Sequence, residues 1–151
     1  MTSLTSRPPL ILMADDDPDD RLLAKDALDE CGFRHELQFI EDGEELMDYL
    51  LRRGRFSGQG AARRPSLILL DLNMPRRDGR EALKEIKADP ILRRIPVVVF
   101  TTSTADTDIV QTYELGGNSF ISKPVAFDAL VQVMRRLTDY WLNTVILPPR
   151  N

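Results

Sequence analysis

The sequence predicts an α/β fold: a doubly wound, five-stranded parallel sheet with helices on both faces. Three observations lead to this prediction. Short apolar runs alternate five times with segments whose apolar residues recur at helical spacing. The run Leu67–Leu70 is continuously apolar and bounded by turn residues, which is typical of a strand buried on both faces. The alternation of strand and helix implies parallel strands joined by right-handed crossovers.

The five expected strands are short and end near polar or turn residues. They cover residues 10–13, 36–40, 67–70, 96–100 and 119–121. An expected helix follows each strand, and its apolar residues form one stripe. The helices cover residues 18–31, 46–51, 79–88, 106–115 and 127–141. Asp17 and Pro18 form a typical helix start, and Gly32 is a typical helix end.

One domain, residues 10–142, accounts for most of the 151-residue chain, because a chain of this length builds one sizeable core but not two. Residues 1–9 are polar and end in two prolines, which predicts a flexible arm. The segment 54–66 is rich in glycine and arginine and predicts a long, flexible, basic loop inserted in the domain. Residues 143–151 are expected to form an extended C-terminal tail.

Composition excludes several classes of protein. Hydrophobic residues make up 42% and charged residues 29% of the chain, values typical of a soluble globular domain. No apolar run approaches the roughly 20 residues that span a membrane, and the N-terminus lacks a secretory signal. The net charge of -4 argues against nucleic-acid binding. A single cysteine, Cys31, excludes an internal disulfide and indicates a cytoplasmic location.

Chemically active side chains follow four of the expected strands. Asp15 and Asp16 follow the first, Asp71 the third, Thr101 the fourth and Lys123 the fifth. Because the carboxyl ends of parallel strands share one edge of a sheet, we expect these groups to converge. Carboxylates held this close repel one another unless a cation joins them, and oxygen ligands of this kind suit Mg²⁺.

A phosphoryl group fits the same edge, because its oxygens need cations and hydrogen-bond donors such as a lysine and a hydroxyl. The chain has no glycine-rich phosphate loop, so the phosphoryl group is expected on a side chain rather than on a nucleotide. Asp71 is the natural acceptor, since aspartyl phosphate is a known type of covalent intermediate. The alternative for Asp71 is a purely structural role as the cap of the following turn.

The site residues together form a specific pattern: Asp15-Asp16, Asp71-x-x-Met74-Pro75-x-x-Asp78-Gly79, Thr101 and Lys123-Pro124. In this order, the pattern resembles the receiver domain of bacterial two-component response regulators. The resemblance covers residues 10–142. It implies the flavodoxin- or CheY-like (βα)5 fold with strand order 2-1-3-4-5. It also implies a phosphoacceptor that modifies only itself rather than an enzyme acting on other substrates.

The resemblance assigns the acceptor and the metal ligands. Asp71 is expected to accept a phosphoryl group from a phosphohistidine. The chain's single histidine, His35, precedes a strand, so the donor is expected to be a partner histidine kinase. Mg²⁺ is expected to bind Asp16, Asp71 and the backbone carbonyl of Asn73, with Asp15 acting mostly through water.

The resemblance also assigns the groups that respond to phosphorylation. Lys123 is expected to pair with the phosphoryl oxygens, and Thr101 to hydrogen-bond one of them and move toward it. Phe120 is expected to turn inward as the threonine moves. Asn73 and Ser103, each two residues beyond a site residue, are positions that tune loss of the phosphoryl group. Pro124 is expected to follow a cis peptide bond.

A narrower resemblance is to single-domain regulators that are partnered with phytochrome histidine kinases. It depends on the Asp17-Pro18-Asp19-Asp20 run, the basic insertion, Thr101-Thr102-Ser103 and the Tyr140-Trp141-Leu142 tail. It implies light signalling with a bacteriophytochrome as the partner kinase. The end of the last helix and the tail are apolar, at Trp141, Leu142, Val145, Ile146 and Leu147. One alternative is that some of these residues cover the core; the other is a homodimer in which the tail reaches a second subunit, because exposed contiguous apolar patches mark interfaces.

Three other functions compete with this interpretation. An EF-hand loop starting at Asp15 fails, because its sixth position is Asp20 rather than glycine and its twelfth is Asp26 rather than glutamate. A haloacid-dehalogenase-like phosphatase is a closer rival, because Asp15 and Asp17 have the spacing of its two acids, although Asp19 stands where threonine or valine is expected. The third is a binding module that is never phosphorylated, and the complete set of site residues argues against it.

Overall fold

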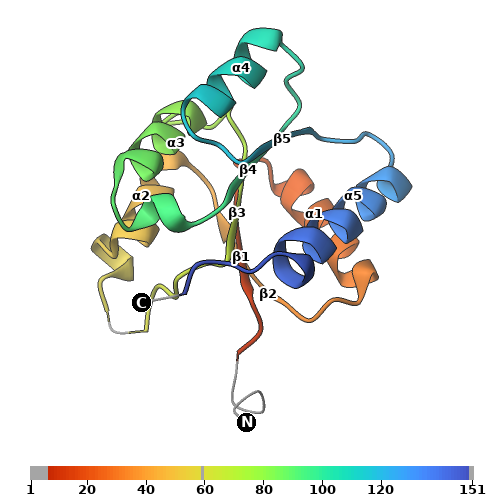
Figure 1. Cartoon of the computed structure of the whole chain (residues 1–151), viewed down its shortest axis with the longest axis horizontal. Helices are drawn as coiled ribbons and strands as arrows, with labels where there is room; N and C mark the ends of the chain where they lie inside the picture. The colour runs from red at the N-terminus through yellow and green to blue at the C-terminus, as the bar shows by residue number, and fades with distance from the viewer. Residues whose placement is uncertain (1–6, 59, 150–151) are drawn as a thin grey trace.

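The computed structural model describes residues 7–58 and 60–149. Within these residues, five parallel strands form one sheet in the order β2-β1-β3-β4-β5. Helices α2, α3 and α4 lie on one side of the sheet, and α1 and α5 on the other (Figure 1). The predicted doubly wound fold and strand order are therefore confirmed. No helix in the described part of the chain is long and apolar enough to cross a membrane.

The elements lie close to their predicted positions. The strands are β1 Leu10–Ala14, β2 Glu36–Ile40, β3 Leu67–Leu70, β4 Val97–Thr101 and β5 Ser119–Ser122. The helices are α1 Pro18–Cys31, α2 Gly43–Leu51, α3 Gly79–Ala88, α4 Asp106–Glu114 and α5 Phe127–Asp139, and short helical turns cover Gly54–Phe56 and Leu92–Arg94. Helix α2 begins earlier than predicted because the Asp42 carboxylate accepts a hydrogen bond from the Glu45 backbone N–H at 2.8 Å and so caps it.

Strand β3 is buried on both faces, as predicted. Ile68 and Leu70 belong to the apolar cluster beneath α2 and α3, whereas Leu67 and Leu69 belong to the cluster beneath α1 and α5. Side chains alternate across a strand, so one continuous apolar run supplies both cores. This burial fixes the register of the sheet, and with it the position of Asp71 directly after β3.

The described residues of the basic segment 54–66 make several contacts with the rest of the domain. Phe56 is buried and packs edge-on against the Tyr49 ring, with centroids 5.0 Å apart. The Tyr49 hydroxyl donates to the Arg63 carbonyl at 2.6 Å, and Arg63 Nη1 donates to Glu36 Oε1 at 2.7 Å. These contacts tie Phe56 and Arg63 to the rest of the domain, while Arg55, Gly58 and Ala61 are exposed, so the flexibility of this loop stays a prediction.

The predicted N-terminal arm, residues 1–9, lies mostly outside the described residues. Of its described part, Arg7 donates to Glu36 Oε1 at 2.8 Å, and the Pro9 carbonyl accepts from the Glu36 backbone N–H at 2.9 Å. These contacts continue the β1–β2 ladder toward the N-terminus.

The final helix changes geometry before the tail begins. Helix α5 ends at Asp139, and Tyr140–Thr144 form a π-helical turn in which the Val145 N–H donates to the Tyr140 carbonyl at 2.9 Å. Trp141 and Leu142 are partly buried against the core beneath α1 and α5. The α-helix predicted to reach residue 141 is thus two residues shorter.

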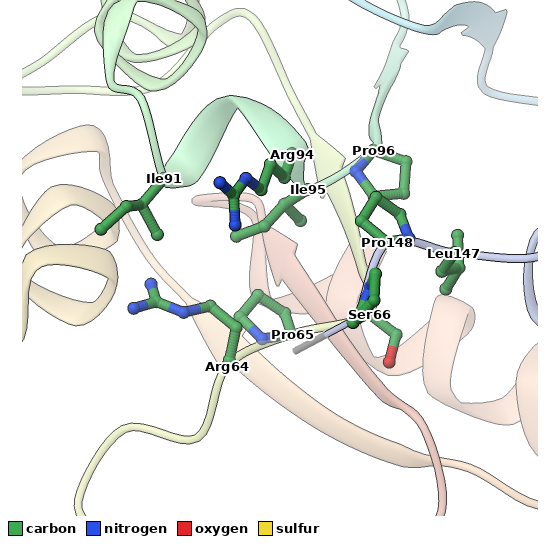
Figure 2. A pocket seen from close by; sticks show the side chains of 10 residues that line it. Arg64, Pro65, Ser66, Ile91, Arg94, Ile95, Pro96, Leu147 and Pro148 are labelled. Carbon is green, nitrogen blue, oxygen red and sulfur yellow. The ribbon is translucent and has the colours of Figure 1, made fainter. Parts of the chain in front are cut away.

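The tail returns to the amino edge of the sheet, opposite the edge where Asp71 lies. Leu147 and Pro148 face Ser66 and Pro96, which immediately precede β3 and β4 (Figure 2). A pocket of about 270 Å³ lies between the tail and the chain beneath it. Ile146 has no such cover and is 99% exposed.

Candidate functional site

Four strand ends meet at the carboxyl edge of the sheet, as the sequence predicts. The Lys123 ammonium donates to Asp15 Oδ2 at 2.5 Å and to Asp71 Oδ2 at 3.2 Å. The Thr101 hydroxyl donates to Asp71 Oδ1 at 2.9 Å. Asp15, Asp71 and Thr101 are buried, so these contacts form in a region of reduced dielectric constant, where they are stronger than in water.

Three carboxylates form a group that can hold a cation. One carboxylate oxygen each from Asp15, Asp16 and Asp71 lies within 4.8 Å of the others. Asp16 is exposed at the mouth of the site, whereas the other two lie beneath it. A set of hard, anionic oxygen donors with an open side toward water fits Mg²⁺, which keeps several of its waters when it binds protein.

Burial and charge act against each other in this group. Burial raises the pKa of Asp15, and the hydrogen bond and charge of Lys123 oppose that rise. For Lys123, burial lowers the pKa, but hydrogen bonds to Asp15 and Asp20 and the charge of Asp71 outweigh it, so its pKa lies above the ordinary 10.5. Lys123 is therefore a permanent cation that partly neutralises the carboxylates.

Asp20 is a site residue that the sequence reasoning missed. It lies in the first turn of α1, and its Oδ2 accepts from Lys123 Nζ at 2.9 Å. In the sequence it is one of several acids at a helix start, where the helix dipole is sufficient reason for it. The signal that could have identified it is its place on the turn of α1 that faces the strand ends.

The turn after β3 fixes the geometry of Asp71. The Asn73 backbone N–H donates to Asp71 Oδ1 at 3.1 Å, and the Gly79 N–H donates to the Leu72 carbonyl at 2.9 Å. A Cβ atom on Gly79 would lie 2.2 Å from the Asp71 carbonyl oxygen, so only glycine allows α3 to start this close to Asp71. The Asn73 side chain is exposed beside the site.

The remaining predicted residues lie around this centre. Ser103 follows Thr101 on the loop to α4, and its hydroxyl donates to Asp108 Oδ2 at 2.6 Å, rather than toward Asp71. Phe120 is partly buried against the core beneath α2 and α3. The described residues contain no cis peptide bond, so the expectation of one before Pro124 is wrong.

Comparison with known proteins matches most of the chain to response regulators. A family model described as the response regulator receiver domain matches residues 11–135. Response regulator Rcp1 of Synechocystis sp. is 39% identical over 148 residues, which are 98% of this chain and 99% of Rcp1.

Two solved structures extend this comparison. The crystal structure of the phosphorylated cyanobacterial phytochrome response regulator RcpA has a TM-score of 0.87 and 41% identity, covering 95% of this chain and 100% of RcpA. The Mn²⁺-bound form of Rcp1 has a TM-score of 0.86 and 40% identity, covering 94% of this chain and 100% of that structure. The likeness therefore includes the fold over nearly the full length of the described chain.

Proposed function

Because this chain belongs to the response regulator receiver domain family, we propose that Asp71 accepts a phosphoryl group from a phosphohistidine of a partner kinase. The observation that carries this proposal is the placement of Asp71 between the Thr101 hydroxyl at 2.9 Å and the Lys123 ammonium at 3.2 Å, beside two further acids. A carboxylate oxygen of Asp71 forms the new bond to phosphorus as the bond to the histidine nitrogen breaks. The imidazole that leaves then takes up a proton.

The acidic group is proposed to hold Mg²⁺. Asp15, Asp16 and Asp71 would supply carboxylate oxygens, and Asn73 its backbone carbonyl. When bound, the metal neutralises charge that develops on the phosphoryl oxygens. The Mn²⁺-bound form of Rcp1 supports a divalent cation in this family.

Thr101, Lys123 and Phe120 are proposed to respond to the phosphoryl group. In the structure, the Thr101 hydroxyl donates to Asp71 Oδ1, one of the two carboxylate oxygens that could bond to phosphorus. Phosphorylation places new acceptors farther from β3, so the hydroxyl moves toward them and vacates space that Phe120 can enter. Lys123 exchanges a carboxylate for phosphoryl oxygens without losing an ionic partner. Asn73 and Ser103 flank the path by which water removes the group.

We propose a phytochrome-type histidine kinase as the partner, in the cytoplasm. The likeness to the phytochrome regulator RcpA over 95% of this chain supports the kinase. Cys31, a free thiol in the described chain, is consistent with a reducing compartment. The protein is then a receiver that is itself the only substrate of its phosphorylation. The alternative, a haloacid-dehalogenase-like phosphatase, would instead hydrolyse a generic phosphoester with turnover.

Incubation with acetyl phosphate and Mg²⁺ is expected to add one phosphoryl group to the protein, and the Asp71→Asn variant is expected to remain unlabelled. The amide has no anionic oxygen to attack phosphorus, although it keeps the shape of the site. Intact-mass spectrometry measures the added mass, and EDTA is expected to suppress it. The same labelling is expected from a purified, autophosphorylated phytochrome histidine kinase.

Equal labelling of Asp71→Asn would contradict the assignment of the acceptor. Steady hydrolysis of a generic phosphoester by the wild-type protein would instead favour the phosphatase alternative. Labelling by acetyl phosphate but by no phytochrome kinase would contradict only the proposed partner.

We also propose that the protein forms a homodimer through its C-terminal tail. Ile146 is 99% exposed, and Leu147 borders a pocket at the amino edge of the sheet. A second subunit could cover both. Removal of residues 143–151, or the Ile146→Ser substitution, is expected to shift the mass measured by light scattering from dimer toward monomer.

Val125→Ser is the matched control for Ile146→Ser. Val125 is fully exposed as well, but it lies beside Lys123 at the opposite edge of the sheet. It is expected to leave the mass unchanged. A dimer that survives removal of the tail would contradict the proposal.

A further inference from the structure

Arg80 connects the first turns of α3 and α4 beside the phosphoacceptor site. Its Nε and Nη2 donate to Asp108 Oδ1 at 3.0 and 2.8 Å, and its Nη1 donates to Asp78 Oδ2 at 3.0 Å. The side chains of Arg80 and Asp108 are only 26% and 16% exposed, so water competes little for these bonds. The planar guanidinium therefore holds the start of α4 in a fixed position relative to α3.

Asp108 uses its second oxygen to hold Ser103. The Ser103 hydroxyl donates to Asp108 Oδ2 at 2.6 Å, and the Ala105 N–H donates to Ser103 Oγ at 3.3 Å. A serine hydroxyl has a single hydrogen to donate, and here it is directed to α4. The hydrogen bond from Ser103 and the charge of Arg80 lower the pKa of Asp108, so it remains an anionic acceptor.

These contacts close a ring that begins and ends at Asp71. On one side, the Thr101 hydroxyl binds Asp71 directly, two residues before Ser103. On the other side, Gly79 packs against the Asp71 backbone, and the next residue, Arg80, begins the path through α4 to Ser103. The loop between β4 and α4 is thus held from both directions at the site where phosphorylation would displace Thr101.

On the basis of the proposed phosphorylation of Asp71, we propose that Arg80 is a positioning residue that shortens the lifetime of the phosphoaspartate. Through Asp108 it keeps the Ser103 hydroxyl turned toward α4 and leaves the approach of water open. In hydrolysis, the water oxygen bonds to phosphorus as the bond to the Asp71 oxygen breaks. The products are the Asp71 carboxylate and dihydrogen phosphate, which keeps both water protons.

Release of Ser103 is expected to slow this reaction. A free hydroxyl can donate to a phosphoryl oxygen, and such charge-assisted hydrogen bonds are the strong ones. The bond stabilises the phosphorylated state, and the side chain then occupies space that the attacking water needs. Removal of Arg80 should therefore act through Ser103 and only when Ser103 has its hydroxyl.

The test is a double-mutant cycle on the half-life of the phosphoaspartate. Wild type, Arg80→Gln, Ser103→Ala and the double variant are labelled with acetyl phosphate and Mg²⁺, and the loss of label is followed by intact mass. Arg80→Gln is expected to lengthen the half-life by about three- to tenfold. In the Ser103→Ala background, the same substitution is expected to leave the half-life unchanged.

Two further variants make the result specific. Asp108→Ala frees the hydroxyl directly and is expected to lengthen the half-life as Arg80→Gln does. Arg77→Gln is the matched control, because Arg77 pairs with Glu85 and Glu44 instead. It is expected to keep the wild-type half-life.

An unchanged half-life in both Arg80→Gln and Asp108→Ala would overturn the inference. A change of the same size in the presence and absence of the Ser103 hydroxyl would also overturn it, because it would reflect a general disturbance of the loop. Failure of the proposed function itself is distinguishable, since the wild-type protein would then take up no label on Asp71.

Discussion

The Lys123→Met substitution is expected to destabilise the metal-free protein by roughly 3–5 kcal/mol, because it leaves buried carboxylates without their cation. Lys123 is the shared partner of Asp15, Asp20 and Asp71, and Asp15 is fully buried. Urea unfolding in EDTA measures the loss. Phosphorylation is expected to fall as well, since Lys123 is the side-chain cation beside the proposed acceptor.

The size of this loss is expected to depend on pH. Burial raises the pKa of Asp15, and Lys123 opposes this rise. Without Lys123, Asp15 of the folded variant therefore keeps its proton to a higher pH than Asp15 of the wild type. An acid with a raised pKa in the folded state favours folding as it takes up a proton. The difference in the free energy of unfolding between variant and wild type is therefore expected to narrow as the pH falls from about 8 toward 5. Carboxylates with strongly raised pKa values take up their protons in roughly this range.

Mg²⁺ and a surface lysine provide the controls. Mg²⁺ replaces the missing positive charge, so it is expected to stabilise Lys123→Met more than the wild type. Lys25 also donates to an aspartate, Asp29, at 2.9 Å, but this pair is exposed on one face of α1. Lys25→Met is expected to leave unfolding and labelling unchanged. Equal unfolding curves for the two lysine variants would contradict the role given to Lys123.

The Gly79→Ala substitution is expected to destabilise the protein by about 1–3 kcal/mol and to reduce phosphorylation of Asp71. Helix propensity alone favours alanine over glycine by up to about 1 kcal/mol. The added Cβ, however, would lie 2.2 Å from the Asp71 carbonyl oxygen and 2.7 Å from the Leu72 Cα. Both are backbone atoms that cannot rotate aside, so the steric cost exceeds the gain in propensity.

Gly58→Ala tests whether this effect is local. A Cβ on Gly58 would meet its nearest neighbour, the Ala61 Cβ, at 3.9 Å, which is ordinary contact. This variant is expected to match the wild type in thermal unfolding and in labelling by acetyl phosphate. If Gly79→Ala proved as stable and as readily labelled as Gly58→Ala, the close approach of α3 to Asp71 would be needed for neither stability nor phosphorylation.

The sequence was sufficient to predict the sheet and the residues at its carboxyl edge. Strand periodicity placed Asp71 and Thr101 at strand ends, and parallel topology then required those ends to meet. This reasoning depends on local pattern and on one general rule of topology, which tertiary packing rarely overrides. The comparisons with known proteins confirm the family and the fold.

Contacts between particular side chains could not be predicted in this way. Arg80 and Asp108 lie 28 positions apart in a chain rich in both charges, so no pattern selects that pair. The 54–66 segment was predicted to be flexible because its glycines and arginines are common in loops, and the burial of Phe56 depends on its fit against Tyr49. Such fits are properties of the folded structure rather than of local sequence.

The π-helical turn Tyr140–Thr144 sets the direction in which the C-terminal tail leaves the last helix. A π turn accommodates one residue more than an α turn, and single-residue insertions into helices are a common way to make one. Each residue of a helix advances the chain by about 100° around the axis. Loss of one residue here would rotate the following chain about the helix axis, and Leu147 would no longer lie beside Ser66 at the start of β3. The number of residues in a single turn thus sets the direction of the tail and the face of the domain that it covers. The residues around Asp71 are not changed by such a deletion.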